Sequence, residues 1–329
     1  MNKIKWGVLG TAYIFERDTA RGMALADNCE LTAIAGRSME KAKEFQKKYG
    51  FQKTCKSYEE LLDDPEIEAV YIPLPNTLHY KWTLEALRHG KHVLCEKPLA
   101  PTSEQARDMF RTAEENHVLL MEAFAYQHSP YIQDIKRMIE HGRIGELRYA
   151  EAALITSDYD HSNIRMRRET LGGCTYDVGV YALSLLLRIF GEEPEKIHAS
   201  ACLSEEGIDT YTTGILEYSG GKKAHFDCGM VLETEKNSSL DRFQLHGSKG
   251  CIISENFAFN APGVLTYRLR TFDGADELHE VEVANNYQME IEQFGRCIRG
   301  LETPHVTEAF SVSLADTVDR ILKEIKYAQ

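Results

Sequence analysis

The first 123 residues alternate short apolar runs with helix-like stretches, and this alternation limits the fold more than any other feature. The predicted strands are Lys3–Leu9, Leu31–Ala35, Ala69–Ile72, His92–Cys95 and Val118–Met121, with a weak strand around Lys53–Cys55. The predicted helices are Tyr13–Ala26, Glu40–Tyr49, Tyr58–Leu62, Leu78–His89 and Ser103–Asn116. Strands joined through helices make right-handed crossovers and therefore a parallel sheet. We expect an α/β domain with helices on both faces of that sheet.

The pattern changes after Phe124, where two helices (Tyr131–Glu140 and Tyr176–Ile189) and alternating strands are predicted. Phe226, Cys228, Met230 and Leu232 share one strand face, and His225 and Asp227 share the other. Gly220-Gly221 separates the strands Tyr211–Tyr218 and Lys222–Leu232, and Gly247–Gly250 predicts a second hairpin. The second domain is therefore expected to be α+β, with a large, mostly antiparallel sheet and one open face.

These patterns place a first domain at residues 1–123 and a second at 124–329. The chain ends in two amphipathic helices. One is lined by Tyr287, Ile291, Phe294 and Ile298, the other by Leu314, Val318, Ile321, Leu322 and Ile325. The sequence leaves open whether residues 285–329 pack back on the first domain.

Composition and charge exclude several classes of protein. The net charge of −13 disfavours non-specific binding to nucleic acid or an anionic membrane, but not a local pocket for a small anion. No stretch approaches the roughly 18 apolar residues of a membrane helix, and no signal peptide is recognisable. The eight cysteines lack Cys-x-x-Cys spacing and no His-x-x-x-His pair occurs, so we expect reduced thiols, a cytoplasmic protein and no metal.

The turn after the first strand is a candidate dinucleotide site. In a G-x-G-x-x-G fingerprint starting at Gly10, Ala12 and Phe15 replace the second and third glycines. The position between a strand and a helix still favours a pyrophosphate on free backbone N–H groups, and the alternative is a plain strand-to-helix turn. The candidate contacts are Gly10, Thr11, Ala12, Tyr13 and Ile14.

The end of the second strand predicts which dinucleotide binds. An NAD enzyme usually has Asp or Glu there, but this chain has Ala35-Gly36-Arg37-Ser38 and no acid between Leu31 and Met39. The guanidinium of Arg37 suits a 2′-phosphate, and Ser38 can add hydrogen bonds. NADP is therefore favoured, with NAD still possible; the alternative is an exposed arginine that caps the next helix.

Several motifs resemble, in their order along the chain, those of the Gfo/Idh/MocA oxidoreductases. They are Ile72–His79, Cys95-Glu96-Lys97-Pro98, Met121–Phe124, Gly172–Tyr181 and Asn286–Gly300. The resemblance implies a Rossmann-like first domain. It also implies cofactor contacts by Leu74, Pro75, Asn76, His79, Glu96 and Lys97.

The resemblance also implies a catalytic mechanism. Asp177 and Tyr181 are four residues apart on a predicted helix and so share a face. Carried over from the family, Lys97 orients the substrate and tunes Tyr181, the general acid/base, while Asp177 bonds the substrate or Lys97. The alternatives are a surface lysine before a proline turn and an ordinary helix–sheet tyrosine.

The Asp-x-x-x-Tyr pattern resembles the branch of glucose–fructose oxidoreductase, dimeric dihydrodiol dehydrogenase and NADP-dependent D-xylose dehydrogenase. The expected substrate is a sugar, cyclic polyol or trans-dihydrodiol-like compound. The second hypothesis is a non-catalytic NADP(H)- and sugar-sensing protein on the same fold. The family often pairs its open sheets, so we expect a homodimer, although a monomer with a solvated face would alternate similarly.

Two departures make substrate recognition open. Cys174 stands where the family usually has a third glycine, and Gln127 where this branch often has arginine. Tyr126, His128 and Arg165 are candidate substrate contacts. The alternatives are buried structural aromatics for the first two and a surface salt bridge for Arg165.

Overall fold

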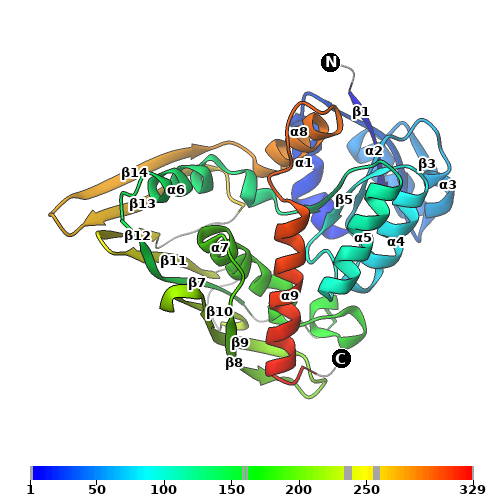
Figure 1. The fold of residues 1–329 in the computed structure, drawn as a ribbon. Coiled ribbons are helices and arrows are strands. Elements are labelled where there is room, and N and C mark those ends of the chain that lie inside the picture. The colour runs from blue at the N-terminus through cyan, green and yellow to red at the C-terminus, as the bar shows by residue number, and fades with distance from the viewer. Residues whose placement is uncertain (1–2, 158–159, 161, 233–238, 255–259, 328–329) are drawn as a thin grey trace. The chain divides into compact units, whose positions relative to one another are not determined.

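The structure is a computed structural model that describes residues 3–157, 160, 162–232, 239–254 and 260–327. It forms two compact units (Figure 1). Unit 1 comprises residues 1–100, 104–128 and 285–311, and unit 2 comprises residues 101–103, 129–284 and 312–329. The prediction that residues 1–123 bind the dinucleotide and residues 124–329 bind the substrate is a statement about function, and it stays a prediction.

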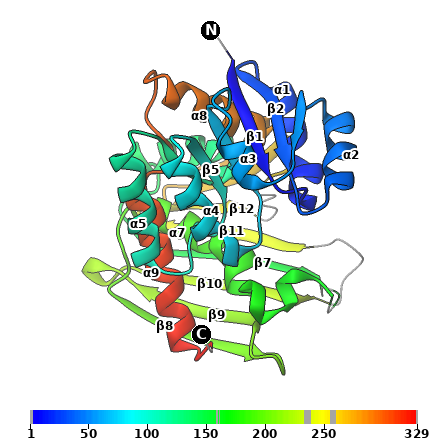
Figure 2. The same cartoon turned by 90° about the vertical axis from the view of Figure 1, so that its right-hand side faces the viewer.

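Unit 1 is built on the predicted parallel sheet. Its six strands lie in the order β3-β2-β1-β4-β5-β6 and every neighbouring pair is parallel. The strands are β1 (Ile4–Leu9), β2 (Cys29–Ala35), β3 (Lys53–Cys55), β4 (Ala69–Ile72), β5 (His92–Glu96) and β6 (Leu120–Ala123). Strand β4 is buried at every position, as expected where helices cover both faces of a sheet (Figure 2).

The helices of unit 1 fall close to their predicted positions. They are α1 (Ala20–Leu25), α2 (Met39–Tyr49), α3 (Tyr58–Leu62), α4 (Asn76–Arg88), α5 (Ser103–Glu115, whose first residue belongs to unit 2) and α8 (Asn286–Ile298). A π-helical turn, Phe15–Thr19, precedes α1, and a 3-10 turn, Ala125–His128, follows β6. Helix α8 packs on α1, where a Cβ on Gly22 would come within 2.5 Å of Tyr287.

One strand of unit 1 begins later than predicted. Val118 and Leu119 were expected in the last strand, but β6 starts at Leu120. The N–H of Val118 instead donates to Ala113 at 3.0 Å and closes the end of α5, while His117 adopts a positive φ of 56°. Val118 therefore belongs to the C-terminal cap of α5 and not to the strand that follows.

Unit 2 is built on an eight-stranded sheet in the order β14-β13-β12-β11-β7-β10-β9-β8. Only β7 and β10 pair in parallel; the other neighbours are antiparallel, as predicted. The strands are β7 (Leu147–Ser157), β8 (Lys196–Leu203), β9 (Asp209–Glu217), β10 (Lys223–Leu232), β11 (Ser239–Gly247), β12 (Gly250–Ser254), β13 (Gly263–Thr271) and β14 (Asp276–Val283). Both predicted hairpins form: one joins β9 to β10 and the other joins β11 to β12.

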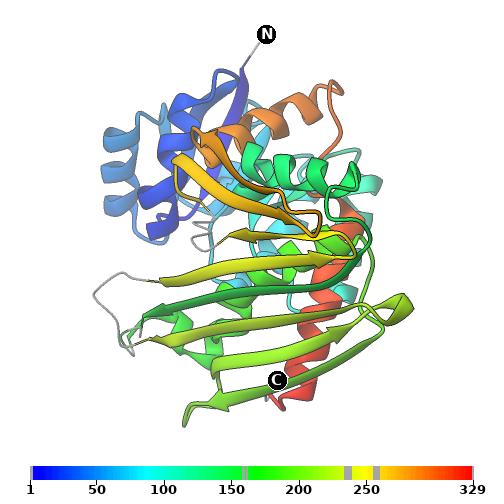
Figure 3. The same cartoon turned by 90° about the vertical axis from the view of Figure 1, so that its left-hand side faces the viewer.

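Helices cover one face of this sheet and leave the other open (Figure 3). They are α6 (Pro130–Glu140), α7 (Val180–Phe190) and α9 (Glu308–Glu324), whose first turn belongs to unit 1. Phe226, Cys228 and Met230 are buried under the helices, as predicted, and the side chain of Leu232 lies outside the described residues. The segment Arg168–Phe190 is long and apolar enough to cross a membrane, but 72% of its apolar window is buried inside the structure.

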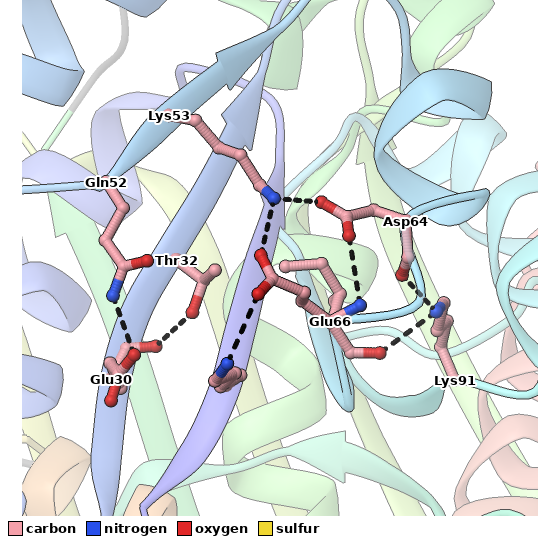
Figure 4. Close-up of polar contacts among 9 residues, drawn as sticks. Glu30, Thr32, Gln52, Lys53, Asp64, Glu66 and Lys91 are labelled. Atoms are coloured by element: carbon pink, nitrogen blue, oxygen red, sulfur yellow. Dashed lines mark hydrogen bonds and ion pairs between the residues drawn. The ribbon is translucent and has the colours of Figure 1, made fainter.

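The amino ends of the unit 1 strands carry a network of polar contacts (Figure 4). The ammonium of Lys53 lies 2.6 Å from Asp64 and 2.9 Å from Glu66. Lys91, just before β5, donates to the carbonyl oxygens of Asp64 and Ile67 at 2.7 and 2.9 Å. In parallel α/β sheets ligands bind at the opposite, carboxyl edge, so this network serves as structure.

Candidate active site

The turn after β1 is shaped by a glycine and an aromatic cluster. Gly10 has φ +120°, and a Cβ there would come within 3.0 Å of the Leu74 side chain. Phe15, in the third fingerprint position, is fully buried. Its ring contacts those of Phe45, Tyr49, Phe51 and Tyr71. In the usual fingerprint a glycine at this position lets the helix pack closely on the sheet; here the packing of Phe15 holds the helix in place. The side chains of the turn itself stay at least partly exposed: Thr11, Ala12, Tyr13 and Ile14.

Arg37 and Ser38 follow β2 at the same edge of the sheet. Ser38 is the N-cap of α2, and its hydroxyl accepts from the N–H of Lys41 at 3.3 Å. Arg37 is exposed and has no ion-pair partner among the described residues. A guanidinium without a carboxylate partner beside a helix N-terminus can bind an added phosphate.

The loop after β4 carries the next predicted contacts. Leu74, Pro75 and Asn76 are partly exposed, and α4 begins at Asn76. His79, in contrast, is fully buried: Nδ1 lies 2.8 Å from the carbonyl oxygen of Pro98, and Nε2 lies 2.7 Å from that of Leu74. Burial lowers the pKa of His79. Its side chain faces the protein interior, so any effect of His79 on a cofactor would be indirect.

Glu96 ends β5 at the same edge, and Lys97 directly follows the strand. The hydroxyl of Tyr71 donates to Glu96 and lies 2.9 Å from the hydroxyl of Thr19, in the first helical turn after the fingerprint. Lys97 is partly exposed, and its peptide bond to Pro98 is cis. The hydrogen bonds of Tyr71 thus connect the fingerprint helix to the strand that carries Lys97, a link that the sequence analysis missed.

A buried glutamate of β6 completes this group. Glu122 is 2% exposed, and its Oε1 accepts from the N–H of Leu99 at 2.8 Å. Burial raises the pKa of Glu122 to about 7 and also raises that of Glu96, against the opposing effects of Tyr71 and Lys97. Perturbed carboxyl groups of this kind cluster at functional sites. The signal for Glu122 was present in the sequence as a single charge in the apolar run Leu119–Phe124.

The substrate candidates of unit 1 lie in the interior. Tyr126 is fully buried and His128 is 5% exposed, which agrees with the alternative of structural aromatics. The ring of His128 stacks on that of His305 with centroids 5.2 Å apart, and its Nε2 lies 3.9 Å from Glu290.

Unit 2 contributes the Gly172–Tyr181 motif. A Cβ on Gly172 would come within 2.4 Å of the carbonyl oxygen of Arg165, and one on Gly173 within 2.1 Å of Asp209 Oδ1. Both glycines are therefore required by close packing. Asp209, which the sequence analysis missed, is buried, and its Oδ2 accepts from the N–H and hydroxyl of Thr175 at 2.8 and 2.6 Å. It holds the start of the central helix.

The predicted helix over Tyr176–Ile189 forms with a π-helical first turn, Thr175–Gly179, followed by α7. Such turns are frequent at functional sites. Asp177 lies in this turn and Tyr181, partly exposed, in the first turn of α7. Arg165 Nε lies 2.7 Å from Asp177 Oδ1, so the structure joins two of the predicted site residues in one ion pair. The distance supports the salt-bridge alternative for Arg165.

No group of three His, Cys, Asp or Glu side chains suited to a metal ion occurs among the residues that the structure describes.

Comparisons with known proteins agree with this arrangement. Residues 4–124 match the model of an oxidoreductase family with an NAD-binding Rossmann fold, and residues 132–253 match the GFO/IDH/MocA C-terminal domain. A trans-1,2-dihydrobenzene-1,2-diol dehydrogenase of Xenopus laevis is 31% identical over 98% of each chain. D-xylose 1-dehydrogenase (NADP(+)) 2 of Haloferax volcanii is 32% identical over 96% of this chain and 95% of that protein.

A solved structure is also similar over its whole length. A 3-ketoreductase from Actinomadura kijaniata, in complex with NADP and TDP-benzene, superimposes with a TM-score of 0.90. It is 28% identical and covers 98% of each chain. The relatives are named as dehydrogenases and reductases, and the chain belongs to the Gfo/Idh/MocA family of oxidoreductases.

Proposed function

We propose that the protein transfers hydride between NADP(H) and a hydroxyl/carbonyl pair of a sugar, cyclic polyol or trans-dihydrodiol-like substrate. The observation that carries the proposal is the carboxyl edge of the unit 1 sheet. That edge carries an exposed Arg37 with no ion-pair partner among the described residues, the open turn at Gly10, and Glu96 and Lys97 at the end of β5. The names of the xylose dehydrogenase and of the ketoreductase complex support NADP as the cofactor.

The residues of unit 1 fit a dinucleotide. Gly10 keeps side-chain atoms away from the turn at the helix N-terminus, where backbone N–H groups would receive the pyrophosphate. Arg37 would pair with the 2′-phosphate, with Ser38 beside it. Leu74, Pro75 and Asn76 would contact the nicotinamide ribose, and Glu96 and Lys97 would border the ring. When bound, the nicotinamide supplies or accepts the hydride.

Tyr181 is the proposed general acid/base. In the direction of reduction its hydroxyl gives a proton to the substrate oxygen as the carbonyl carbon receives hydride; in oxidation it takes that proton back. The ammonium of Lys97 would favour the phenolate and hold the same oxygen. Asp177, fixed by Arg165, would hydrogen-bond the substrate or Lys97.

The first experiment is cofactor binding, followed by quenching of intrinsic fluorescence with NADPH and NADH in parallel. We expect much tighter binding of NADPH. In Arg37→Ala the NADPH affinity should fall at least tenfold while the NADH affinity changes little. Equal losses for both cofactors would remove Arg37 from the 2′-phosphate site.

The second experiment is turnover with NADP(H). The trial substrates are D-xylose, D-glucose, 1,5-anhydro-D-fructose and trans-1,2-dihydrobenzene-1,2-diol. Tyr181→Phe should lower kcat at least 100-fold with cofactor affinity retained. The matched control is Tyr176→Phe, a buried tyrosine one turn earlier. Tight NADPH binding without turnover of any compound would favour the sensing protein instead.

We further propose a cytoplasmic homodimer that pairs the open faces of two unit 2 sheets. The open face exposes Ile215, Val264 and Leu278 by 43%, 61% and 54%. Val264 and Leu278 lie on the neighbouring strands β13 and β14, and Ile215 lies on β9, toward the other end of the sheet. Exposed apolar side chains on an open sheet face support an interaction surface. Light scattering should give a molecular mass twice that of the chain. In Ile215→Lys the measured mass should fall to that of a single chain. A monomer at micromolar concentration would contradict the proposal, and cell fractionation tests the compartment.

A further inference from the structure

The turn that carries Lys97 is held from two sides by buried side chains. The ring of His79, on α4, reaches the carbonyl oxygen of Pro98 at 2.8 Å. The carboxylate of Glu122, on β6, accepts from the N–H of Leu99 at 2.8 Å. These contacts fix the two residues that directly follow Lys97, and all of them lie within unit 1.

His79 also fixes the loop after β4, because its other ring nitrogen lies 2.7 Å from the carbonyl oxygen of Leu74. Both partners are acceptors, so a neutral ring donates to one of them and a doubly protonated ring to both. The doubly protonated ring therefore bridges the proposed ribose loop and the lysine turn, whereas the neutral ring donates to one of them and packs against the other. Movement of one would therefore be transmitted to the other.

Glu122 does more than accept one hydrogen bond. Its Oε2 is buried; burial raises the pKa of Glu122, and the hydroxyl of Ser311, in the first turn of α9, opposes that shift most. A neutral acceptor would satisfy the N–H of Leu99 without the cost of a buried carboxyl group. Two charged groups act on the pKa of Glu122: Glu96 raises it and Lys97 lowers it. Of these, only the ammonium of Lys97 favours an ionised Glu122.

We propose that His79 and Glu122 are positioning residues of the hydride-transfer site: both hold the Lys97-Pro98-Leu99 turn, and the carboxyl group of Glu122, bonded two residues beyond Lys97, acts on its ammonium. This inference rests on the proposed function for the role of Lys97. It adds two residues that touch neither substrate nor cofactor and act through the lysine.

The test combines a measurement on Lys97 itself with kinetics. Glu122→Gln keeps an acceptor for Leu99 and removes the charge, and Glu122→Asp keeps the charge. His79→Gln replaces the two ring nitrogens with a single amide nitrogen, which cannot occupy both of their positions. The matched control is Glu104→Gln, an exposed glutamate on α5. Competitive acetylation with acetic anhydride at pH 8, read by peptide mass spectrometry, compares Lys97 with the exposed Lys43.

In Glu122→Gln we expect acetylation of Lys97 to rise at least threefold relative to Lys43, because the ammonium loses its neighbouring charge. We expect kcat to fall about tenfold with the NADPH affinity within threefold. The limb of the kcat profile near pH 7, where Glu122 ionises, should disappear. Glu122→Asp should stay close to the unmodified protein in acetylation. In His79→Gln both kcat and NADPH affinity should fall, because the lysine turn and the ribose loop lose their common tether.

Unchanged acetylation of Lys97 in Glu122→Gln overturns the proposed charge effect, even if kcat falls. Unchanged kcat and NADPH affinity in His79→Gln overturn the proposed tether. Lys97→Met, assayed alongside, separates these results from the function itself. If it keeps normal turnover, the catalytic role of Lys97 is wrong, while the acetylation result, which needs no substrate, still judges the placement of the charge.

Discussion

Strand β5 has a lysine at each end, and the two lysines have opposite surroundings. Lys91, at the amino end, is 6% exposed and donates to two backbone carbonyl oxygens. Lys97, at the carboxyl end, is partly exposed on a turn held by His79 and Glu122. The residue type is the same in both cases. The edge of the parallel sheet at which a lysine lies therefore decides whether it serves the structure or the proposed chemistry.

The carboxyl groups at the two edges differ in the same way. At the amino edge the hydrogen bond from Lys53 holds the pKa of Glu66 below its usual value. At the carboxyl edge burial raises the pKa of Glu96 and Glu122. At the amino edge the surroundings favour the ionised form of the carboxyl groups. At the carboxyl edge burial disfavours ionisation, which is typical of an active site.

The largest effect should separate the two lysines. Lys97→Met should lower kcat by about 100- to 10,000-fold, the usual range for loss of a group that assists proton transfer, with the NADPH affinity little changed. Lys91→Met should instead lower the free energy of unfolding by about 1–3 kcal/mol, because two buried carbonyls lose their donor, and leave kcat within twofold. Steady-state kinetics and urea denaturation measure both. Equal losses of kcat would break the comparison.

The second prediction concerns the pH dependence of stability. With a folded pKa of about 7 against a usual value of 4.5, Glu122 keeps its proton in the folded state over that interval. The free energy of unfolding should therefore fall as pH rises from about 4.5 to about 7, by up to about 3 kcal/mol from this group. Glu122→Gln should lack this loss, and urea denaturation at pH 5 and pH 8 measures it.

The control for this prediction is Glu66→Gln at the amino edge. Because the pKa of Glu66 is lowered in the folded state, its contribution is present above its unfolded pKa and is lost as the solution is acidified. Its effect should therefore have the opposite sign and be much smaller, since the side chain is exposed. A stability difference between Glu122→Gln and the unmodified protein that is independent of pH would contradict the buried ionisation.

Two glycines sharpen the comparison for cofactor binding. Gly10→Ala, at the carboxyl edge, introduces a side chain at φ +120° and within 3.0 Å of Leu74, so NADPH affinity should fall at least tenfold. Gly50→Ala, at the end of α2 on the amino side, meets nothing within 4 Å and should cost only about 1 kcal/mol of stability. Fluorescence titration with NADPH distinguishes them. Unchanged affinity in Gly10→Ala would place the pyrophosphate elsewhere.

The sequence alone predicted most of the fold, because the spacing of apolar residues and the positions of turn-forming glycines are local signals. The parallel strands, both hairpins and the amphipathic α8 and α9 all follow from apolar spacing and glycine pairs. The start of β6 was misplaced because the C-cap of α5 competes for the same apolar run. The π-helical turn before α7 gave no signal in the sequence. It begins two residues after Gly173, which packs against Asp209 of the distant strand β9.

The candidate site was predicted where strand ends and motifs coincide, as at Gly10, Arg37 and Lys97. It was incomplete where function depends on a tertiary partner. Tyr71 and Glu122 sit in apolar runs that read as core, and only the fold shows that their polar atoms meet Glu96 and Leu99. The role of His79 as a buried bridge also needed the fold, because its two partners are backbone carbonyls that carry no sequence signature.

The smallest effect is expected at the amino-edge network itself. Lys53 pairs with Asp64 and Glu66, but its side chain is 39% exposed. An exposed pair contributes about 0.2–1 kcal/mol and is screened by salt, so Lys53→Met should lower the free energy of unfolding by about 0.5 kcal/mol at low salt and by less in 0.5 M KCl. Cofactor affinity and kcat should not change, since the mutation lies at the edge away from the proposed dinucleotide site. A fall in NADPH affinity in this variant would mean that the two edges are coupled through the short strands between them, and that the division into a structural and a chemical edge is too simple.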